Sequence, residues 1–273
     1  MASLNTKTLF ITGASRGIGL AIALRAARDG ANIAVIAKTA EPHPRLPGTI
    51  YTAAESIEKA GGQALPIATD IRFEEQVASA VEQTVHRFGG IDILVNNASA
   101  IQLSNTEQTE LKRFDLMFQV NVRGTFLCSR LCLPHLQKSS QAHVLTMAPP
   151  ISLETKWFAG HAAYTVSKFG MAMMTFGIAA EFDECGIAFN CLWPKTIIKT
   201  AALAMIPGID TSRCRTPEIV ADAAYAILTK DPTQLRGQFC IDEEILKAEG
   251  MTNFDKYAIN PRIEPIPELF VDS

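Results

Sequence analysis

The amino-acid sequence predicts an α/β fold, a Rossmann-type doubly wound parallel seven-stranded sheet with helices on both faces. Three observations predict it. Short apolar runs alternate with helical patterns along the chain, several of these runs are apolar at nearly every position, and a glycine-rich turn follows the first run. Such alternation requires right-handed βαβ crossovers. Uninterrupted apolar strands are typical of a sheet that is covered on both faces.

Seven apolar segments are expected as strands, namely residues 7–12, 32–37, 64–68, 91–95, 143–147, 187–192 and 237–241. Apolar residues at helical spacing lie between them, over residues 17–28, 50–60, 73–88, 107–136, 162–184 and 217–230. The sequence contains no repeat, low-complexity tract or linker. We therefore expect residues 1–273 to form a single domain with a C-terminal tail from about residue 243.

The composition restricts the classes of partner. Lys and Arg number 25 and Asp and Glu 28, for a net charge of -3, so there is no electrostatic reason to expect nucleic acid or an anionic membrane. The apolar stretch at residues 171–180 is too short to span a bilayer, and the N-terminus lacks the features of a signal peptide. Six cysteines lie scattered in apolar segments, which indicates reduced thiols. We expect a soluble cytoplasmic protein with a small-molecule partner.

Three long loops, residues 38–49, 148–160 and 193–216, follow the second, fifth and sixth expected strands. All three leave the carboxyl edge of a parallel sheet, where ligands bind in such folds. The loop after the sixth strand is expected to supply an apolar lid over the site, made of Ile197, Ile198, Leu203, Met205 and Ile206.

A glycine-rich turn joins the first strand to the first helix. Glycines there permit positive φ angles and bring backbone N–H groups close to a pyrophosphate, which the helix N-terminus also attracts. The turn predicts a dinucleotide site at Gly13, Ala14, Ser15, Arg16, Gly17, Ile18 and Gly19.

The residue that would contact the adenosine ribose is basic. An acidic side chain that binds the ribose 2′-hydroxyl of NAD is expected about twenty residues after the turn, but Lys38 stands there and Arg16 projects from the turn. Cations at this position favour a 2′-phosphate. NADP(H) is therefore preferred and NAD(H) remains possible; the alternative is that Lys38 is a solvated strand-end lysine.

Further motifs follow in order: Asn96-Asn97-Ala98 after the fourth strand, Asn121 in the next helix, and Tyr164 and Lys168 four residues apart. Together with the glycine turn they make residues 5–245 resemble the short-chain dehydrogenase/reductase superfamily. Finer features resemble its hydroxysteroid dehydrogenase-like branch, namely residues 37–44, 48–54, 192–196 and 253–259. A sterol-carrier-like domain often follows the dehydrogenase in that branch. The sequence ends before one, so we do not expect lipid-carrier activity.

Tyr164 and Lys168 lie on the same helix face. A neighbouring ammonium and an oxidised nicotinamide both favour the phenolate, so Tyr164 can exchange a proton with the substrate oxygen during hydride transfer. The resemblance implies that Lys168 also binds the nicotinamide ribose and that Asn121 positions a water in a proton relay. It further implies that Asp70 meets the adenine and that the backbone at Asn97 lies beside the adenosine ribose. The alternative for Asp70 is a cap for the helix from residue 73.

One position departs from the family pattern. The family places a serine at the end of the fifth strand to hold the substrate oxygen, and Ala148 stands there. Ser152, in the following loop, is the candidate to replace it. The leading hypothesis is an NADP(H)-dependent oxidoreductase that interconverts a carbonyl and a secondary alcohol on an apolar substrate. The alternative is a cofactor-binding module with little or no catalysis, and a sugar-nucleotide epimerase or dehydratase fits less well.

Other candidate residues are interpreted as structural. Cys128 and Cys132 lack a histidine pattern nearby, so we expect packing residues and no metal site. His161 is expected at the surface at a helix start. The resemblance implies that the helices carrying Asn121 and Tyr164 form a subunit interface, and therefore a homodimer or homotetramer. Methionines of the second helix, Met171, Met173 and Met174, are expected in the core or in that interface.

Overall fold

The computed structural model describes residues 3–43, 46–203 and 208–272. Its strands form one sheet in the order β3-β2-β1-β4-β5-β6-β7, and every neighbouring pair is parallel. The predicted doubly wound fold is therefore confirmed. The strands are β1 (Thr8–Thr12), β2 (Asn32–Ala37), β3 (Gln63–Ala68), β4 (Ile93–Asn96), β5 (His143–Thr146), β6 (Ala188–Trp193) and β7 (Gln238–Ile241).

Strand β1 is the point at which the strand order reverses. Its residue Ile11 lies opposite Val35 of β2 on one side and Val95 of β4 on the other. The connections after β1 and β4 therefore leave in opposite directions and open a crevice at the carboxyl ends of these strands. Ligands of open α/β sheets bind in such a crevice.

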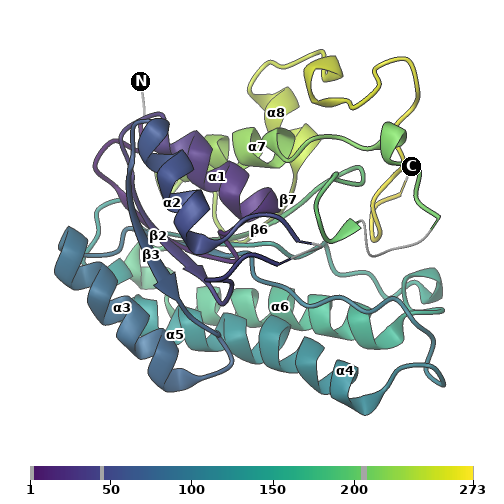
Figure 1. Cartoon of the computed structure of the whole chain (residues 1–273), viewed down its shortest axis with the longest axis horizontal. Coiled ribbons are helices and arrows are strands. Elements are labelled where there is room, and N and C mark those ends of the chain that lie inside the picture. Colours follow the sequence, from purple (N-terminus) through teal and green to yellow (C-terminus); the bar gives the residue numbers. More distant parts are fainter. Residues whose placement is uncertain (1–2, 44–45, 204–207, 273) are drawn as a thin grey trace.

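Helices cover both faces of the sheet (Figure 1). One layer contains α1 (Gly17–Ala27), α2 (Ile50–Lys59), α7 (Glu218–Leu228) and α8 (Asp242–Ala248). The opposite layer contains α3 (Glu74–Phe88), α4 (Leu111–Met117), α5 (Gly124–Leu136) and α6 (Ala162–Glu181). None of the helices in the described part of the chain is both long and apolar enough to cross a bilayer.

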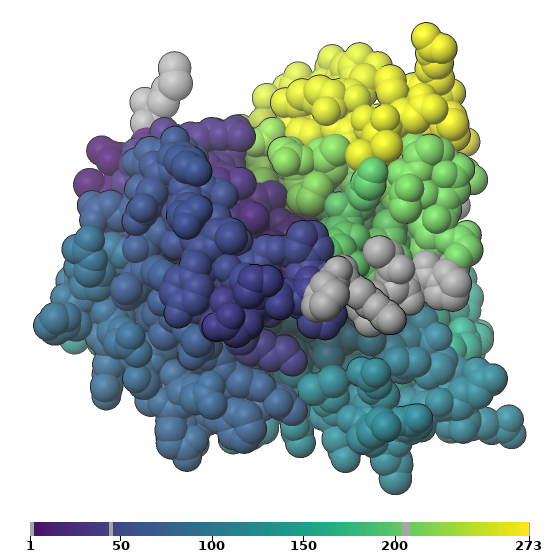
Figure 2. Space-filling view, in the orientation of Figure 1, coloured from purple at the N-terminus to yellow at the C-terminus, as the bar shows by residue number. Residues whose placement is uncertain are grey.

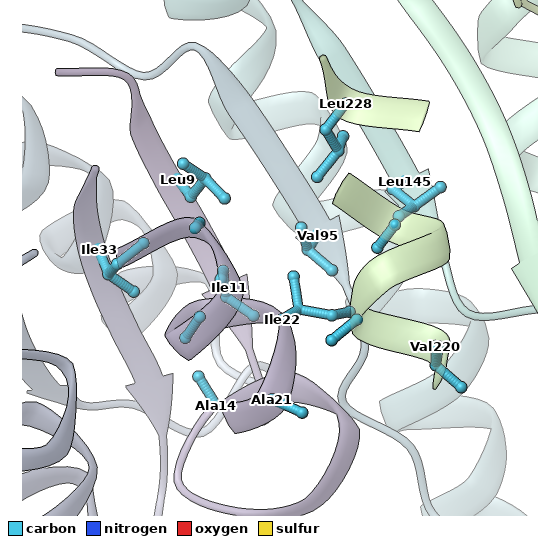
Figure 3. Close-up of a cluster of buried hydrophobic side chains, with 14 of the residues drawn as sticks. Leu9, Ile11, Ala14, Ala21, Ile22, Ile33, Val95, Leu145, Val220 and Leu228 are labelled. Carbon is cyan, nitrogen blue, oxygen red and sulfur yellow. The ribbon is translucent and has the colours of Figure 1, made fainter. Parts of the chain in front are cut away.

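Alternate side chains of β1 point to opposite faces of the sheet and pack against the two helical layers. Leu9 and Ile11 pack with Ile22 of α1 and Val220 of α7 (Figure 3), whereas Phe10 packs with α3 and α5. All three strand side chains have no exposed surface. Successive strand residues point to opposite faces, so burial on both sides explains why the run is apolar without interruption.

The segment predicted to be helical over residues 107–136 forms two α-helices joined by a π-helical turn. It begins at Leu111, passes through a π-helical turn at Phe118–Arg123, and continues as α5. A π-turn inserts one extra residue into the helix and often marks a functional site. The turn contains Asn121, whose side chain is completely buried.

After α8 the chain returns to the carboxyl edge of the sheet. The backbone N–H of Ile197 donates to the carbonyl of Ile266, and that of Glu268 donates to Lys195, so the end of the chain runs beside the segment that follows β6. Figure 2 shows the result on one face: the C-terminal part, in green and yellow, meets the N-terminal part, in purple and blue.

Candidate active site

The glycine turn after β1 packs directly against the end of β4. Gly13 and Gly17 have φ angles of +69° and +59°, in the region that favours glycine. A Cβ on Gly13 would lie 2.8 Å from Nδ2 of Asn97, and one on Gly19 would lie 2.7 Å from the carbonyl oxygen of Gly13. The first and third glycines therefore make room for backbone and for Asn97.

Thr12 and Asn97 fix the two strand ends to each other. The Thr12 hydroxyl accepts from the backbone N–H groups of Asn97 and Ala98, both at 3.0 Å, and donates to the carbonyl of Val95. The Asn97 amide in turn donates to the carbonyls of Thr12 and Gly13 at 2.8 and 3.2 Å. The Asn97 side chain is thus occupied in holding the turn.

A cavity of about 680 Å³ begins at this turn. Its volume lies within the range of small-molecule and cofactor sites. Of the residues predicted to bind the cofactor, those that line it are Gly13, Ser15, Arg16, Gly17, Ile18, Lys38, Asp70 and Asn97. Ala14 and Gly19 lie beneath the turn and are buried.

Two cations lie at the end of the cavity near β2. Lys38 is exposed, and within residues 3–43, 46–203 and 208–272 its ammonium has no hydrogen bond or ion pair. Arg16 instead holds the loop before α2, because its Nε and Nη2 donate to the carbonyls of Pro47 and Gly48 at 2.9 and 2.6 Å. Arg16 can still offer its remaining N–H groups to an anion.

Asp70 is paired with a third cation that the sequence analysis missed. Arg72 binds its carboxylate through Nε at 2.9 Å and Nη2 at 2.6 Å, which holds the pKa of Asp70 below its usual range. Helix α3 has Phe73 at its N-cap without a side-chain cap, so Asp70 does not cap it. An acidic residue two before an arginine was the available signal for this pair.

The Asn121 side chain ties the loop after β4 to α6. Its Oδ1 accepts from the backbone N–H of Ala100 at 2.7 Å, and its Nδ2 donates to the Ala100 carbonyl and the Ser167 hydroxyl at 3.0 and 2.9 Å. Both amide hydrogens are therefore used within the protein, and Asn121 shapes the site by positioning α6 relative to residue 100.

Tyr164 and Lys168 lie one turn apart on α6, and only 6% and 2% of their surfaces are exposed. The Lys168 ammonium donates to the carbonyl of Met147 at 2.6 Å and lies 5.0 Å from the ring centre of Trp193. Burial lowers the pKa of Lys168 to about 7. Burial also raises the pKa of Tyr164, and the carboxylate of Glu268 raises it further, so the hydroxyl is protonated at neutral pH.

The family model described as short chain dehydrogenase matches residues 7–207. The chain belongs to the short-chain dehydrogenase/reductase family. Hydroxysteroid dehydrogenase-like protein 2 of Danio rerio is 58% identical over 266 residues, which cover 97% of this chain and 64% of that protein. The chain thus spans less than two thirds of the length of this relative. The family model and the similar solved structures are described as dehydrogenases.

Two solved structures are similar to this chain over nearly its whole length. A putative dehydrogenase from Xanthomonas campestris is 56% identical with a TM-score of 0.97, covering 99% of this chain and 100% of that one. A short chain dehydrogenase from Mycobacterium thermoresistibile is 51% identical with a TM-score of 0.94, covering 99% and 97%. The resemblance to the family that the motifs indicated is confirmed.

Neither residue considered for the missing serine donates a hydroxyl hydrogen bond to Tyr164 in the described part of the chain. Ala148 is 1% exposed and packs with Met171 and Cys191 in a separate buried cluster. The Ser152 hydroxyl accepts from the backbone N–H of Glu154 at 3.3 Å, within its own loop. In the described part of this short-chain dehydrogenase, no serine hydroxyl is hydrogen-bonded to the Tyr164 hydroxyl.

Of the apolar residues expected to form a lid, the structure describes Ile197, Ile198 and Leu203, and none of these three lines the cavity. Ile198 and Leu203 are 4% and 8% exposed, and Ile198 belongs to the core beneath α7. Met205 and Ile206 lie outside the described residues. The loop after β6 does border the cavity, through residues 200–202.

The C-terminal segment packs against Tyr164, where the loop after β6 was expected to form a lid. Phe270 is 4% exposed, and its ring centre lies 6.2 Å from that of Tyr164. His161, expected at the surface, is half-buried, and its ring centre lies 6.3 Å from that of Phe270. The apolar triplet at residues 269–271, near the end of the tail, was the signal that the sequence analysis passed over.

Proposed function

We propose that this protein is an NADP(H)-dependent oxidoreductase that interconverts a carbonyl and a secondary alcohol on an apolar small-molecule substrate, with Tyr164 as the proton donor and acceptor. The observation that carries the proposal is the buried Tyr164–Lys168 pair on α6, at the same sheet edge as the cavity that begins at the glycine turn. A phenol beside a buried amine is suited to exchanging a proton with a substrate oxygen.

The residues at the glycine turn fit a dinucleotide. Arg16 is the N-cap of α1 and makes no side-chain cap, so the first N–H groups of this helix lack a side-chain partner there. They border the cavity together with Gly13 and Gly17. A pyrophosphate would accept hydrogen bonds from these groups, and the helix dipole favours its negative charge.

The preference for NADP(H) rests on Lys38. Its ammonium borders the cavity at the end of β2, where the adenosine ribose binds in this type of fold. A 2′-phosphate there would be attracted by Lys38 and by the free N–H groups of Arg16. NAD(H) would leave Lys38 and the remaining N–H groups of Arg16 without an anionic partner.

The chemistry assigned to the chain is proton transfer. A bound NADPH supplies the hydride that reaches the carbonyl carbon. Tyr164 donates its phenolic proton to the carbonyl oxygen, and Lys168, with a pKa of about 7, can return a proton to the phenolate that is left. In the opposite direction Tyr164 accepts the proton of the alcohol. With both Asn121 amide hydrogens in use, a relay water would contact its backbone carbonyl.

We also assign the protein to a homodimer or homotetramer in a reducing compartment, the cytoplasm. Apolar side chains of α5 and α6 are open on the face away from the sheet: Phe126, Val166 and Met173 are 42%, 45% and 62% exposed. Apolar side chains grouped in this way favour a subunit contact. The six cysteines are free thiols, and Cys185 is exposed.

The test is a titration with NADPH and NADH, followed by nicotinamide fluorescence, on the wild type, Lys38→Ala and Tyr164→Phe. We expect NADPH to bind at least about tenfold more tightly than NADH, as loss of one charge-assisted phosphate contact implies. Lys38→Ala should remove this preference. Tyr164→Phe should bind NADPH normally and lose about 10²-fold or more in turnover of a carbonyl panel. If neither NADPH nor NADH bound the wild type, the proposal would be overturned.

A second candidate function is a cofactor-binding module with little catalysis. The observation in its favour is that neither Ala148 nor Ser152 offers a hydroxyl to Tyr164. Loss of one such donor costs roughly 10²- to 10³-fold in rate. NADPH binding without turnover of any carbonyl in the panel would identify this function.

A further inference from the structure

The C-terminal segment, residues 266–272, is fixed across the carboxyl edge of the sheet. The backbone N–H of Glu268 donates to the carbonyl of Lys195 at 3.0 Å, and the indole N–H of Trp193 donates to the carbonyl of Leu269 at 2.7 Å. Asp272 forms an ion pair with Lys156 in the loop after β5. The segment therefore connects the loops that follow β5 and β6.

Phe270 is enclosed by five rings, which we call the Phe270 cage. The ring centroid of Phe270 lies 5.3 Å from that of Phe169 and 5.9 Å from those of Trp157 and Trp193. It lies 6.2 Å from that of Tyr164 and 6.3 Å from that of His161. These are ordinary separations for packed aromatic rings. The cage thus holds one six-membered ring in van der Waals contact on several sides.

The backbone of Phe270 is strained. Its φ angle is +72°, in the left-handed region that bulky side chains rarely adopt. Such a conformation persists only where surrounding contacts hold it, and strained residues gather at functional sites. Here the cage and the Trp193 hydrogen bond to the preceding carbonyl hold the ring in place.

No residue of the cage is among the described residues that line the cofactor cavity, which reaches residues 100–103, Arg113, Leu116, Val120 and residues 200–202. Tyr164 is 6% exposed, so a substrate reaches its hydroxyl only if some neighbour gives way. Among the other buried side chains of the Tyr164 cluster, Met117, Phe169 and Trp193 lie on helices or a strand, whereas Phe270 lies on a segment without regular secondary structure. The Phe270 ring can therefore move without breaking a helix or strand.

We propose that Phe270 fills the subsite for the apolar part of the substrate and sets the size of the group admitted beside Tyr164. The proposal rests on the proposed function, in which Tyr164 exchanges the proton. The space that the ring vacates takes a six-membered carbocycle bearing a ketone or secondary alcohol. A substrate with two fused rings exceeds this space, so Phe270 discriminates against it.

The two tryptophans of the chain give a direct test, because Trp157 and Trp193 both belong to the cage. Their fluorescence is quenched with acrylamide in the full chain and in Phe270→Ala, with and without cyclohexanol, which does not absorb in this range. We expect Phe270→Ala to increase the quenching and cyclohexanol to reverse the increase. The cyclohexanol concentration at half-saturation should be at least about tenfold lower in the variant than in the wild type, as expected when an apolar ring enters a vacated apolar site.

Two further variants keep the test decisive. Phe270→Leu retains an apolar side chain and should give intermediate quenching and affinity, which decides the question if Phe270→Ala does not fold. Phe73→Ala, which removes an aromatic ring that is 47% exposed at the start of α3, should behave as the wild type. Equal cyclohexanol half-saturation in the wild type, Phe270→Ala and Phe270→Leu would overturn the proposal and leave Phe270 as a packing residue.

Turnover gives a second readout. With NADPH, Phe270→Ala should raise kcat/KM for cyclohexanone by about tenfold or more, because the substrate no longer has to displace the ring, whereas 2-decalone should remain a poor substrate; an unchanged kcat/KM for cyclohexanone would contradict the assigned role. The quenching experiment needs no cofactor. A failure of NADPH to bind would therefore overturn the proposed function without deciding the occupancy of the cage, whereas unchanged quenching with normal NADPH binding would overturn only the role of Phe270.

Discussion

At the scale of single residues, the site depends on close approaches that allow no additional atom. Gly13 combines a positive φ angle with a position against Asn97, so two separate penalties arise when a side chain is added there. The Asn97 amide that would be displaced also holds the carbonyls of Thr12 and Gly13. A change at Gly13 therefore moves the end of β4 as well as the turn.

We expect Gly13→Ala to be more destabilising than an alanine at a glycine with only the φ penalty. Gly237 is the matched control, because its φ angle is +66° and nothing lies within 4 Å of an added Cβ. Both changes incur the left-handed penalty of about 1–2 kcal/mol, and Gly13→Ala should lose a further ~1–3 kcal/mol from the clash. Urea unfolding measures both variants, and equal losses would show that the turn relaxes freely.

At the scale of elements, α8 is joined to the end of β6 through a buried carboxylate. Oδ1 of Asp242 accepts from the backbone N–H groups of Lys195 and Glu243 at 2.8 and 2.7 Å, whereas its Oδ2 is buried without a partner in the described part of the chain. Arg215 pairs with Glu243 nearby. Burial raises the pKa of Asp242 to about 6, because a charged carboxylate loses its hydration there.

This pKa gives a pH-dependent stability. The folded-state value of about 6 lies above the ordinary aspartate value of about 3.9. The folded protein therefore binds the proton more tightly, and stability is lost as pH rises from about 4 through 6. Asp242→Asn keeps the accepting oxygen and removes the titration. Its stability relative to wild type should increase by about 3 kcal/mol between pH 4 and pH 8.

Urea unfolding of both proteins at the two pH values checks this expectation. The comparison is made as a difference, so that the titration of other carboxylates, which both proteins share, cancels. A difference that stays constant with pH would show that Asp242 is ionised in the folded protein at all pH values tested, with Arg215 compensating its charge.

At the scale of the whole molecule, the two helical layers differ in how well their outer faces are covered by polar residues. The layer with α5 and α6 leaves Phe126, Val166 and Met173 exposed, and the same two helices carry or adjoin Asn121 and Tyr164. A subunit contact on this face would stiffen α6 and thus the active site.

We expect Met173→Asp to dissociate the oligomer, because it places an unpaired charge in an apolar contact. The control is Tyr51→Asp, which changes a side chain that is 53% exposed on α2, on the other layer. Size-exclusion chromatography with light scattering measures the mass of each. A wild-type monomer, or two variants of equal mass, would contradict the proposed interface.

The sequence by itself determined the fold class, which is a doubly wound parallel sheet, and the position of the glycine turn. Each of these depends on local pattern. The apolar run of Leu9, Phe10 and Ile11 indicates a strand that is buried on both faces of the sheet. Gly13 and Gly17 indicate where the backbone needs positive φ angles. The spacing of Tyr164 and Lys168 places them on one helix face whatever surrounds them.

Only the tertiary structure decided what surrounds these residues. The π-turn at Asn121, the pairing of Arg72 with Asp70 and the burial of Ala148 away from Tyr164 all depend on contacts between segments. Phe270 lies far from Tyr164 in sequence and reaches it because the chain returns from α8 to the end of β6. An irregular segment has no hydrophobic periodicity from which its path could be predicted, so only the folded structure shows its contacts.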